Sequence, residues 1–308
     1  MNTNFTTTHD PEYEKAFWDA MKFRPVTDAV LRKGKTPMGS NKLPDYAADK
    51  LSKALAKESI FRKLGTVIFN QGDHKFWAKN CDDTASWVPE GETIPIYDGM
   101  DDFIQYPIDS HKLAAVIRMD EDFVYSPGYN LEKHMLSHIT KAFSRAEEKA
   151  FLTGNGISEP VGILSADGGA EVGVTTTELT YDDVVALFFS VKPEYRKNGK
   201  WLMNDETALV LRRINDADGN YIWNHNNDTI LGKEVLISEF MPSATAGNSP
   251  VAFGDFSYYT IVDRDHTSVK ALREKFAMNN QIGYLGFELF LDGKLVRPEA
   301  VKVLSITE

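Results

Sequence analysis

The stretch that decides the fold reads SRAEEKAFLTGNGISEPVGIL and runs from Ser144 to Leu164. Its charged first half has helical composition and runs directly into Gly154-Asn155-Gly156. The pattern predicts a helix of about 23 residues, near 35 Å long, with Asn130 as N-cap and a left-handed Gly154 at its C-terminal end. Apolar residues mark one face of this helix: Met135, Ile139, Ala142, Phe143, Ala146 and Ala150.

The glycines that end this helix do not form a phosphate-binding loop. Such a loop follows a strand and opens a helix, so that the helix N-terminus faces the anion. Here the order is reversed, and no Gly-Lys-Ser/Thr follows these glycines. A helix cap and turn is the better interpretation.

The sequence gives equally little support to the other candidate metal-binding and catalytic residues. His134 and His138 have the spacing of two metal ligands on one helical face, but no third ligand accompanies them. Glu147 and Glu148 are adjacent, so they point about 100° apart on a helix and are expected to pair with Arg145, Lys149 or a neighbouring chain. Carboxylates surround Cys81, and no Gly-x-Ser-x-Gly elbow is present. We expect no catalytic residue, no metal site and no cofactor.

Composition narrows the class of protein. Hydrophobic residues make up 42% of the 308 residues, which permits a large core. The net charge of −11 opposes general adhesion to nucleic acid, although it leaves room for a local basic patch. A single cysteine excludes an intrachain disulfide, and no apolar run approaches the roughly 20 residues that span a membrane. The sequence indicates an intracellular protein without a signal peptide.

Two segments have no obvious core of their own. Residues 1–43 combine a short helix, in which Tyr13, Phe17 and Met21 form a stripe, with a basic, breaker-rich piece. The second segment, 80–111, contains eight carboxylates and no lysine or arginine. It predicts two strands joined near Asp98-Gly99, in a ribbon roughly 50 Å long that is not stable alone in water.

We therefore expect this acidic ribbon to dock on another subunit rather than to remain a solvated loop. Its aromatic and aliphatic side chains are too apolar for a free ribbon. Its charge predicts a basic partner surface on an adjacent copy. Candidate contacts are Trp87, Glu90, Glu92, Ile94, Ile96, Phe103 and Tyr106 on the ribbon, with Phe17, Arg32, Lys33, Lys35 and Lys42 on the arm.

The rest of the chain alternates helices and strands without strict order, which predicts an α+β class. Further helices are expected at 46–55, 180–194 and 205–214, the last capped by Asp205. Strands are expected at 59–70, 113–119, 200–204, 231–242 and in several runs after Val251.

Blocks of this sequence resemble the major capsid proteins of tailed bacteriophages with the HK97-type fold. The run AEEKAFLTGNG, 146–156, is similar to the end of that family's spine helix, and WVPEGETIP, 87–95, is similar to its projecting E-loop. GKWLMND, NDADGNYIW, LGKEVLISEFMP and FGDFSYYTIVDR follow in the family's order. The resemblance covers almost the whole chain.

The resemblance implies an α+β HK97-type capsid fold with four parts. These are an N-terminal arm, an E-loop hairpin, a P-domain with the spine helix and an A-domain. The implied ranges are 1–43 (arm), 44–78 (P-domain), 79–112 (E-loop), 113–180 (P-domain, with the spine helix at about 130–153), 181–250 (A-domain), 251–296 (P-domain return strands) and 297–308 (A-domain strand).

The resemblance also implies a function and partners. Such a protein is not an enzyme; it assembles in the host bacterial cytoplasm into hexamers and pentamers of an icosahedral virion shell around double-stranded DNA. Scaffolding and portal proteins, a possible decoration protein and weak nonspecific contact with DNA are implied partners, and no membrane is implied. An encapsulin-type compartment is the alternative of the same fold, and a cytosolic hydrolase using Glu147 or His138 is the alternative of another class.

Two departures from the family pattern matter. One branch cross-links its shell from an E-loop lysine to an asparagine on a neighbour, promoted by a glutamate that Glu288 resembles, with Asn280-Gln281 near the asparagine position. No lysine lies between Lys79 and Lys112, so we expect a noncovalent shell and an inactive Glu288. The arm helix also begins about twelve residues from Met1, so either a separate scaffold directs assembly or the given sequence is a trimmed form.

Overall fold

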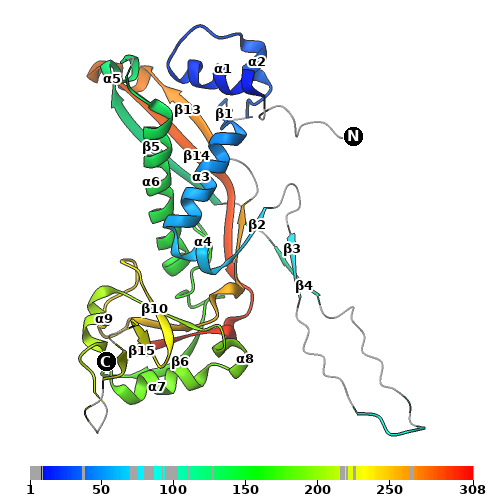
Figure 1. The fold of residues 1–308 in the computed structure, drawn as a ribbon, viewed down its shortest axis with the longest axis vertical. Helices are drawn as coiled ribbons and strands as arrows, with labels where there is room; N and C mark the ends of the chain where they lie inside the picture. The colour runs from blue at the N-terminus through cyan, green and yellow to red at the C-terminus, as the bar shows by residue number, and fades with distance from the viewer. Residues whose placement is uncertain are drawn as a thin grey trace.

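The structure is a computed structural model, which describes most of the chain (Figure 1). Its two large sheets divide the described residues into two layered regions, and a two-stranded ribbon leaves the first of them. No helix among the described residues is both long enough and apolar enough to cross a bilayer. The described residues are 8, 10–36, 39–69, 75–79, 87–91, 93, 103–107, 109, 111–126, 128–215, 219, 221–224, 227–263 and 267–307.

The first region is a six-stranded sheet with two long helices on one face. Its longest strand, β14 (Gln281–Leu295), pairs antiparallel with β5 (His111–Asp120) on one side. On the other side, β14 pairs first with β13 and then with β12. The remaining strands are β13 (Ser268–Leu272), β12 (Tyr259–Asp263), β2 (Thr66–Phe69) and β1 (Asn41–Lys42).

Helix α6 (Leu131–Thr153) and helix α3 (Asp45–Glu58) lie side by side over this sheet (Figure 1). Asn130 caps α6 as predicted, because its side chain accepts a hydrogen bond from the backbone N–H of Lys133 at 3.0 Å. Met135, Ile139 and Phe143 are fully buried against the sheet. The predicted 23-residue helix is therefore confirmed.

The N-terminal arm lies on this same region. Helix α1 (Pro11–Met21) buries Tyr13 and Phe17 completely in the core beneath α3 and α6. The Tyr284 hydroxyl donates to the carbonyl of Met21 at 2.9 Å, which ties the end of α1 to β14. The arm thus finds its apolar partner within its own chain. Helix α2 (Asp28–Arg32) follows it, and α5 (Glu121–Tyr125) joins β5 to α6.

The second region is a seven-stranded mixed sheet in the order β6-β15-β11-β7-β10-β9-β8. Trp201, Leu202 and Met203 in β7 are fully buried, and β7 lies within the strand predicted at 200–204. The strands are β6 (Glu171–Thr176), β7 (Lys200–Met203), β8 (Trp223–Asn224), β9 (Thr229–Ile230), β10 (Lys233–Ile237), β11 (Val251–Gly254) and β15 (Val301–Ile306). The helices are α7 (Tyr181–Ser190), α8 (Pro193–Arg196) and α9 (Asp205–Leu211), and short 3-10 turns are η1 (Phe256–Tyr258), η2 (Glu274–Asn279) and η3 (Pro298–Ala300).

Two strands lie in residue ranges that the resemblance assigns to the P-domain, but both pair in the second sheet. β6, within 113–180, pairs in parallel with β15 in the second sheet. β11, within 251–296, lies between β15 and β7 in that sheet. Both pairings join segments that are far apart in the sequence, and no local sequence pattern predicts such pairing.

Three local predictions were wrong. Residues 59–70 form helix α4 (Ile60–Leu64) before β2, because Ser59 caps a turn of helix through the N–H of Arg62. Helix α9 is capped by Asn204 rather than Asp205. Gly154 is extended, with φ −62°, and glycine is needed there because a Cβ would lie 2.1 Å from the carbonyl oxygen of Pro160.

The described strands at the base of the ribbon are β3 (Lys75–Lys79) and β4 (Phe103–Pro107), which pair antiparallel from Lys75 opposite Pro107 to Lys79 opposite Phe103. The predicted partner strand around Ile94 and Ile96, and the turn at Asp98-Gly99, lie outside the described residues.

Candidate functional site

A buried charge cluster joins four elements of the first region. The Arg62 guanidinium from α4 donates from Nε and Nη2 to the two carboxylate oxygens of Glu147 on α6, each at 2.7 Å. Asp263 of β12 lies 3.7 Å from Arg62, and Glu288 of β14 lies 4.0 Å from it. All four residues are less than 9% exposed. We call these residues the Arg62 cluster.

The Arg62 cluster contains one cation and three carboxyl groups. Burial lowers the pKa of Arg62, but the carboxylates of Glu147, Glu288 and Asp263 outweigh it and hold that pKa above its usual value. Burial raises the pKa of Glu288 well above its ordinary range, and the charge of Asp263 raises it further. A raised pKa favours the neutral, protonated form of Glu288, which leaves fewer uncompensated charges in the core.

The position that resembles the cross-linking glutamate is thus part of the core. Glu288 is 2% exposed, and its Oε2 has no hydrogen-bond partner. Asn280 ends η2 and precedes β14. Eight residues at about 3.3 Å each put Asn280 roughly 26 Å from Glu288 along the strand.

The paired glutamates of the quoted stretch also point inward. Glu147 binds Arg62, and Glu148 accepts a hydrogen bond of 2.5 Å from the Ser238 hydroxyl. Burial raises the pKa of Glu148, which the bond from Ser238 partly offsets. The expected pairing with Arg145, Lys149 or a neighbouring chain was wrong, because both partners come from elements distant in the sequence.

The rings of His134 and His138 lie with their centroids 4.3 Å apart and their planes tilted by 39°. Burial and the neighbouring His138 lower the pKa of His134. Within the described part of the chain, no group of three or more histidine, cysteine, aspartate or glutamate side chains is placed to hold a metal ion.

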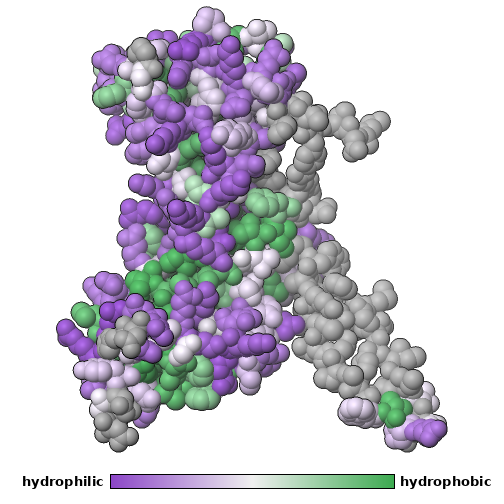
Figure 2. All heavy atoms as spheres, in the orientation of Figure 1, coloured by the Kyte–Doolittle hydropathy of each residue, from purple (hydrophilic) through white to green (hydrophobic). Residues whose placement is uncertain are grey.

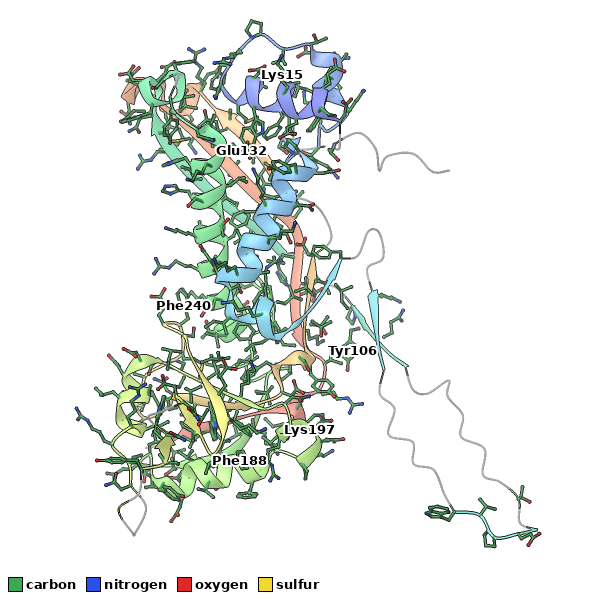
Figure 3. All side chains as sticks on the ribbon, in the orientation of Figure 1. Lys15, Tyr106, Glu132, Phe188, Lys197 and Phe240 are labelled. Atoms are coloured by element: carbon green, nitrogen blue, oxygen red, sulfur yellow. The ribbon has the colours of Figure 1, made fainter. Side chains whose placement is uncertain are left out.

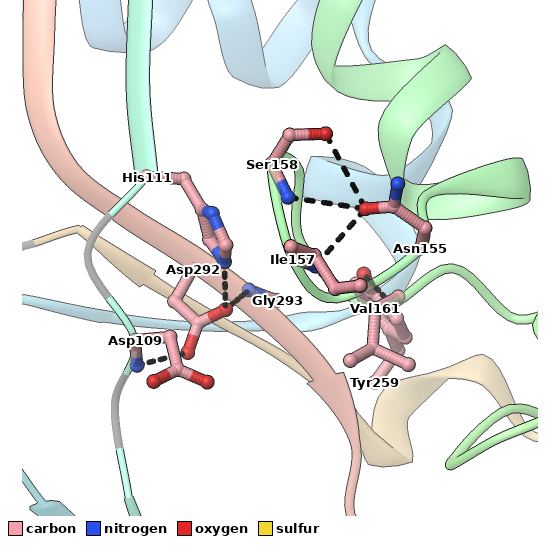
Figure 4. A network of polar contacts seen from close by, with 9 residues as sticks. All are labelled: Asp109, His111, Asn155, Ile157, Ser158, Val161, Tyr259, Asp292 and Gly293. Atoms are coloured by element: carbon pink, nitrogen blue, oxygen red, sulfur yellow. Dashed lines mark hydrogen bonds and ion pairs between the residues drawn. The ribbon is translucent and has the colours of Figure 1, made fainter.

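The turn after α6 is tied to β14 (Figure 4). Asn155 Oδ1 accepts hydrogen bonds from the backbone N–H groups of Ile157 and Ser158, at 3.0 and 3.1 Å. The Tyr259 hydroxyl donates to the carbonyl of Val161 at 2.8 Å. Val161 in turn donates its N–H to the carbonyl of Gly293 at 3.1 Å. The Gly-x-Gly segment is therefore a fixed turn against the sheet.

The same network fixes the base of the ribbon. Asp292 accepts from the N–H of Asp109 at 2.9 Å and lies 3.7 Å from the His111 ring (Figure 4). Burial raises the pKa of Asp292, which the backbone hydrogen bonds from Asp109 and Gly293 partly offset. The Tyr106 hydroxyl donates to the carbonyl of Val296 at 3.0 Å, and Figure 3 shows Tyr106 at this junction.

The outer part of the ribbon differs from its base. Trp87 has a relative exposure of 102%, and Glu90 is exposed. Residues 87–91 lie away from both sheet regions in Figure 1. Glu92, Ile94 and Ile96 lie outside the described residues, as does the side chain of Phe103.

The structure separates the arm residues into two groups. Arg32, Lys33 and Lys35 are exposed around α2, at the opposite end of the molecule from residues 87–91 (Figure 1). A contact between those residues and the ribbon therefore needs two copies of the chain. Phe17 is fully buried in the core of its own chain, so the expectation that it contacts another subunit was wrong.

Comparison with known proteins agrees with this architecture. Residues 39–306 match the phage capsid family. The chain belongs to that family. The major capsid protein of Klebsiella oxytoca phage phiKO2 is 21% identical over 249 residues, which are 75% of this chain and 58% of that protein. The match thus spans less than two thirds of the curated relative.

Solved capsid structures share the fold of this phage capsid protein. The capsid of an empty GTA particle is 26% identical, with a TM-score of 0.64 over 82% of this chain and 90% of that one. The structure from Gordonia phage Cozz is 13% identical, with a TM-score of 0.56 over 81% and 87%. The satellite phage P4 procapsid, which includes the size determination (Sid) protein, is 11% identical, with a TM-score of 0.57 over 84% and 90%. The predicted α+β HK97-type fold is confirmed.

Proposed function

We propose that this chain is the major capsid protein of a tailed phage and forms hexamers and pentamers of an icosahedral, noncovalent virion shell around double-stranded DNA. The observation that carries the proposal is the fully exposed Trp87 on a ribbon that leaves its own subunit. An apolar side chain of this size gains free energy only when a second surface covers it, at roughly 25 cal/mol per Å². Membership of the phage capsid family supports that second surface being another copy.

In this proposal, the two sheet regions correspond to two different domains of the capsid fold. The first region with α6 is the P-domain, the second sheet with α7 and α9 is the A-domain, and residues 79–112 are the E-loop. Because β6 and β11 pair in the second sheet, we assign both to the A-domain. The exposed Arg32, Lys33 and Lys35 remain candidate contacts for the acidic ribbon of a neighbour.

Further partners belong to the same proposal. Scaffolding and portal proteins, with a possible decoration protein outside, would complete the particle. An encapsulin-type compartment has the same fold, but the family match and the capsid relatives support the phage shell. A hydrolase using Glu147 or His138 finds no support, because Glu147 is held by Arg62 in the core.

Electron microscopy of the protein expressed alone, with light scattering alongside, tests the proposal. Closed particles or capsomer rings are expected, and a denaturing gel should show monomers only. A ladder of covalent multimers would contradict the noncovalent shell. A stable monomer that does not assemble, even when co-expressed with a scaffold candidate, would contradict the shell function itself.

A further inference from the structure

The outward face of α6 carries charge of one sign. Its exposed charged residues are Lys133, Lys141, Arg145 and Lys149. Its carboxylates are used elsewhere: Glu147 and Glu148 point into the core, and half-buried Glu132 binds Lys50 of α3 at 2.8 Å. A chain with a net charge of −11 therefore presents one face whose helix charges are basic.

Neighbouring elements extend this face. Lys53 and Lys57 are exposed on α3, which packs beside α6, and Lys63 is exposed on α4. Figure 2 shows the side formed by α3 and α6 as predominantly hydrophilic. We call Lys53, Lys57, Lys63, Lys141, Arg145 and Lys149 the basic helix face.

Acidic groups also border this face, and they do not cancel it. Asp49 and Glu58 are exposed on α3, and Glu239 lies 2.8 Å from Arg145. The Arg145–Glu239 pair is itself exposed, and a guanidinium has five N–H donors, so Arg145 keeps donors for a second anion. Lys141 and Lys149 form no ion pair with another described residue.

We infer that the basic helix face is the surface on which this shell protein holds the phosphate backbone of packaged duplex DNA. Lys141, Arg145 and Lys149 follow one another at intervals of four residues, which places three cations along about 12 Å of helix. A duplex carries one negative charge per roughly 1.7 Å of its axis, so such a row meets several phosphates without reading the base sequence. The inference rests on the proposed shell function and adds the surface that faces the DNA.

The surface composition favours DNA over a protein partner. Helix α6 contains none of the large hydrophobic residues that are exposed in the described structure. Protein–protein interfaces are anchored by buried aromatic and apolar side chains, whereas protein–DNA interfaces are more polar and positively charged. The outward residues between the cations of α6 include Ser137 and Ala142, which are too small to anchor a protein partner.

A matched pair of triple variants tests the inference in the full-length chain. The first variant is Lys141→Gln/Arg145→Gln/Lys149→Gln. The control is Arg118→Gln/Lys270→Gln/Lys275→Gln, which makes the same change in net charge with exposed residues on β5, β13 and η2, away from the α6 face of the sheet. Fluorescence anisotropy of a labelled 30-base-pair duplex, titrated with unassembled protein from 50 to 200 mM salt, gives affinity and salt dependence.

We expect the α6 variant to bind about tenfold or more weakly at 50 mM salt and to lose about 2 to 3 from the slope of log affinity against log salt. The control variant should stay close to the parent protein. Equal weakening by both variants would overturn the inference, because net charge alone would then explain binding. No weakening by the α6 variant would also overturn it.

Shell formation by both variants, measured by electron microscopy, separates this inference from the proposed function. If shells form normally and DNA binding is unchanged, the inference fails while the shell function stands. If the α6 variant binds DNA normally but no longer forms shells, the face serves a protein partner such as a scaffold, and the DNA inference fails. If the parent chain itself forms no shells under any condition, the proposed function fails.

Discussion

The Arg62 cluster and the outer ribbon place their side chains in opposite environments: the cluster buries charged groups, whereas the ribbon exposes an apolar one. In the Arg62 cluster, charges from four elements are buried together, and a bidentate ion pair with distances of 2.7 Å holds two of them. In the ribbon, a large aromatic side chain, Trp87, is completely exposed. The subunit thus places these charged groups together in its own core, whereas the large apolar side chain of Trp87 has no cover within the chain. Under the proposed shell function, this difference assigns subunit stability and shell stability to separate residues.

Replacing the cation of the Arg62 cluster should have the largest effect on folding. In Arg62→Met, Glu147 loses both hydrogen bonds and stays buried beside Asp263 and Glu288. We expect a loss of about 3–5 kcal/mol in the free energy of unfolding, because removing one partner leaves uncompensated buried charge. Urea unfolding of the unassembled chain measures it.

Arg145→Met is the control for this change. Arg145 makes an exposed ion pair with Glu239, and such pairs contribute about 0–1 kcal/mol. Equal losses in the two variants would show that burial of the Arg62 cluster is not what makes it costly to break.

A substitution in the outer ribbon should have the opposite effect: it should leave subunit folding nearly unchanged and weaken assembly. Trp87→Ala should change the free energy of unfolding of the subunit by no more than about 0.5 kcal/mol, since the side chain contacts little in its own chain. It should weaken each contact between subunits by about 2 kcal/mol, the scale of a buried tryptophan anchor. Particle yield and the melting temperature of particles measure this second effect.

Trp87→Phe keeps an aromatic ring and should restore most of the particle yield. Normal particles from Trp87→Ala would remove Trp87 from the interface and remove the main support for the proposed function of the ribbon.

The free energy of unfolding should depend on pH through Glu288 of the Arg62 cluster. Its folded-state pKa is raised, so above the ordinary pKa of a glutamate the unfolded chain releases a proton that the folded chain keeps. This contribution to stability is present in full at low pH and is lost as the pH rises through the folded-state pKa, with a slope of at most about 1.4 kcal/mol per pH unit.

Glu288→Gln removes this titration and keeps a group that can donate to Asp263. The variant should therefore gain stability relative to the parent protein as the pH rises from about 4.5 to 8 in urea-unfolding experiments. The exposed Glu274→Gln serves as the control and should show no such trend. A constant difference between Glu288→Gln and the parent protein across this range would contradict a retained proton.

The smallest expected effect concerns the start of α6. Asn130→Ala removes the bond to the N–H of Lys133 and should cost about 1 kcal/mol of subunit stability. Ser137→Ala, at an exposed position of the same helix, should be nearly neutral in the same urea measurement. A cost in Asn130→Ala no larger than that in Ser137→Ala would mean that the cap hydrogen bond is not formed in solution.

The sequence by itself determined the elements that depend on neighbouring residues. The apolar stripe and Asn130 predicted α6 within a residue, and the strands expected at 113–119 and 200–204 are found as β5 and β7. The family resemblance added the HK97-type fold, which the capsid structures confirm. Trp87, a large aromatic residue in an acidic segment, was predicted as a contact residue, and its side chain is fully exposed in the structure.

Only the tertiary structure decided which distant residues meet. Arg62 and Glu147 are 85 positions apart, and nothing in either local segment indicates their ion pair. The same holds for Phe17, whose stripe looked unpartnered until α3 and β14 covered it, and for Gly154, whose need for glycine comes from the carbonyl of Pro160. Helix and strand periods are set by hydrogen bonds between near neighbours, whereas ion pairs, burial and close approach depend on how the two sheets bring remote segments together.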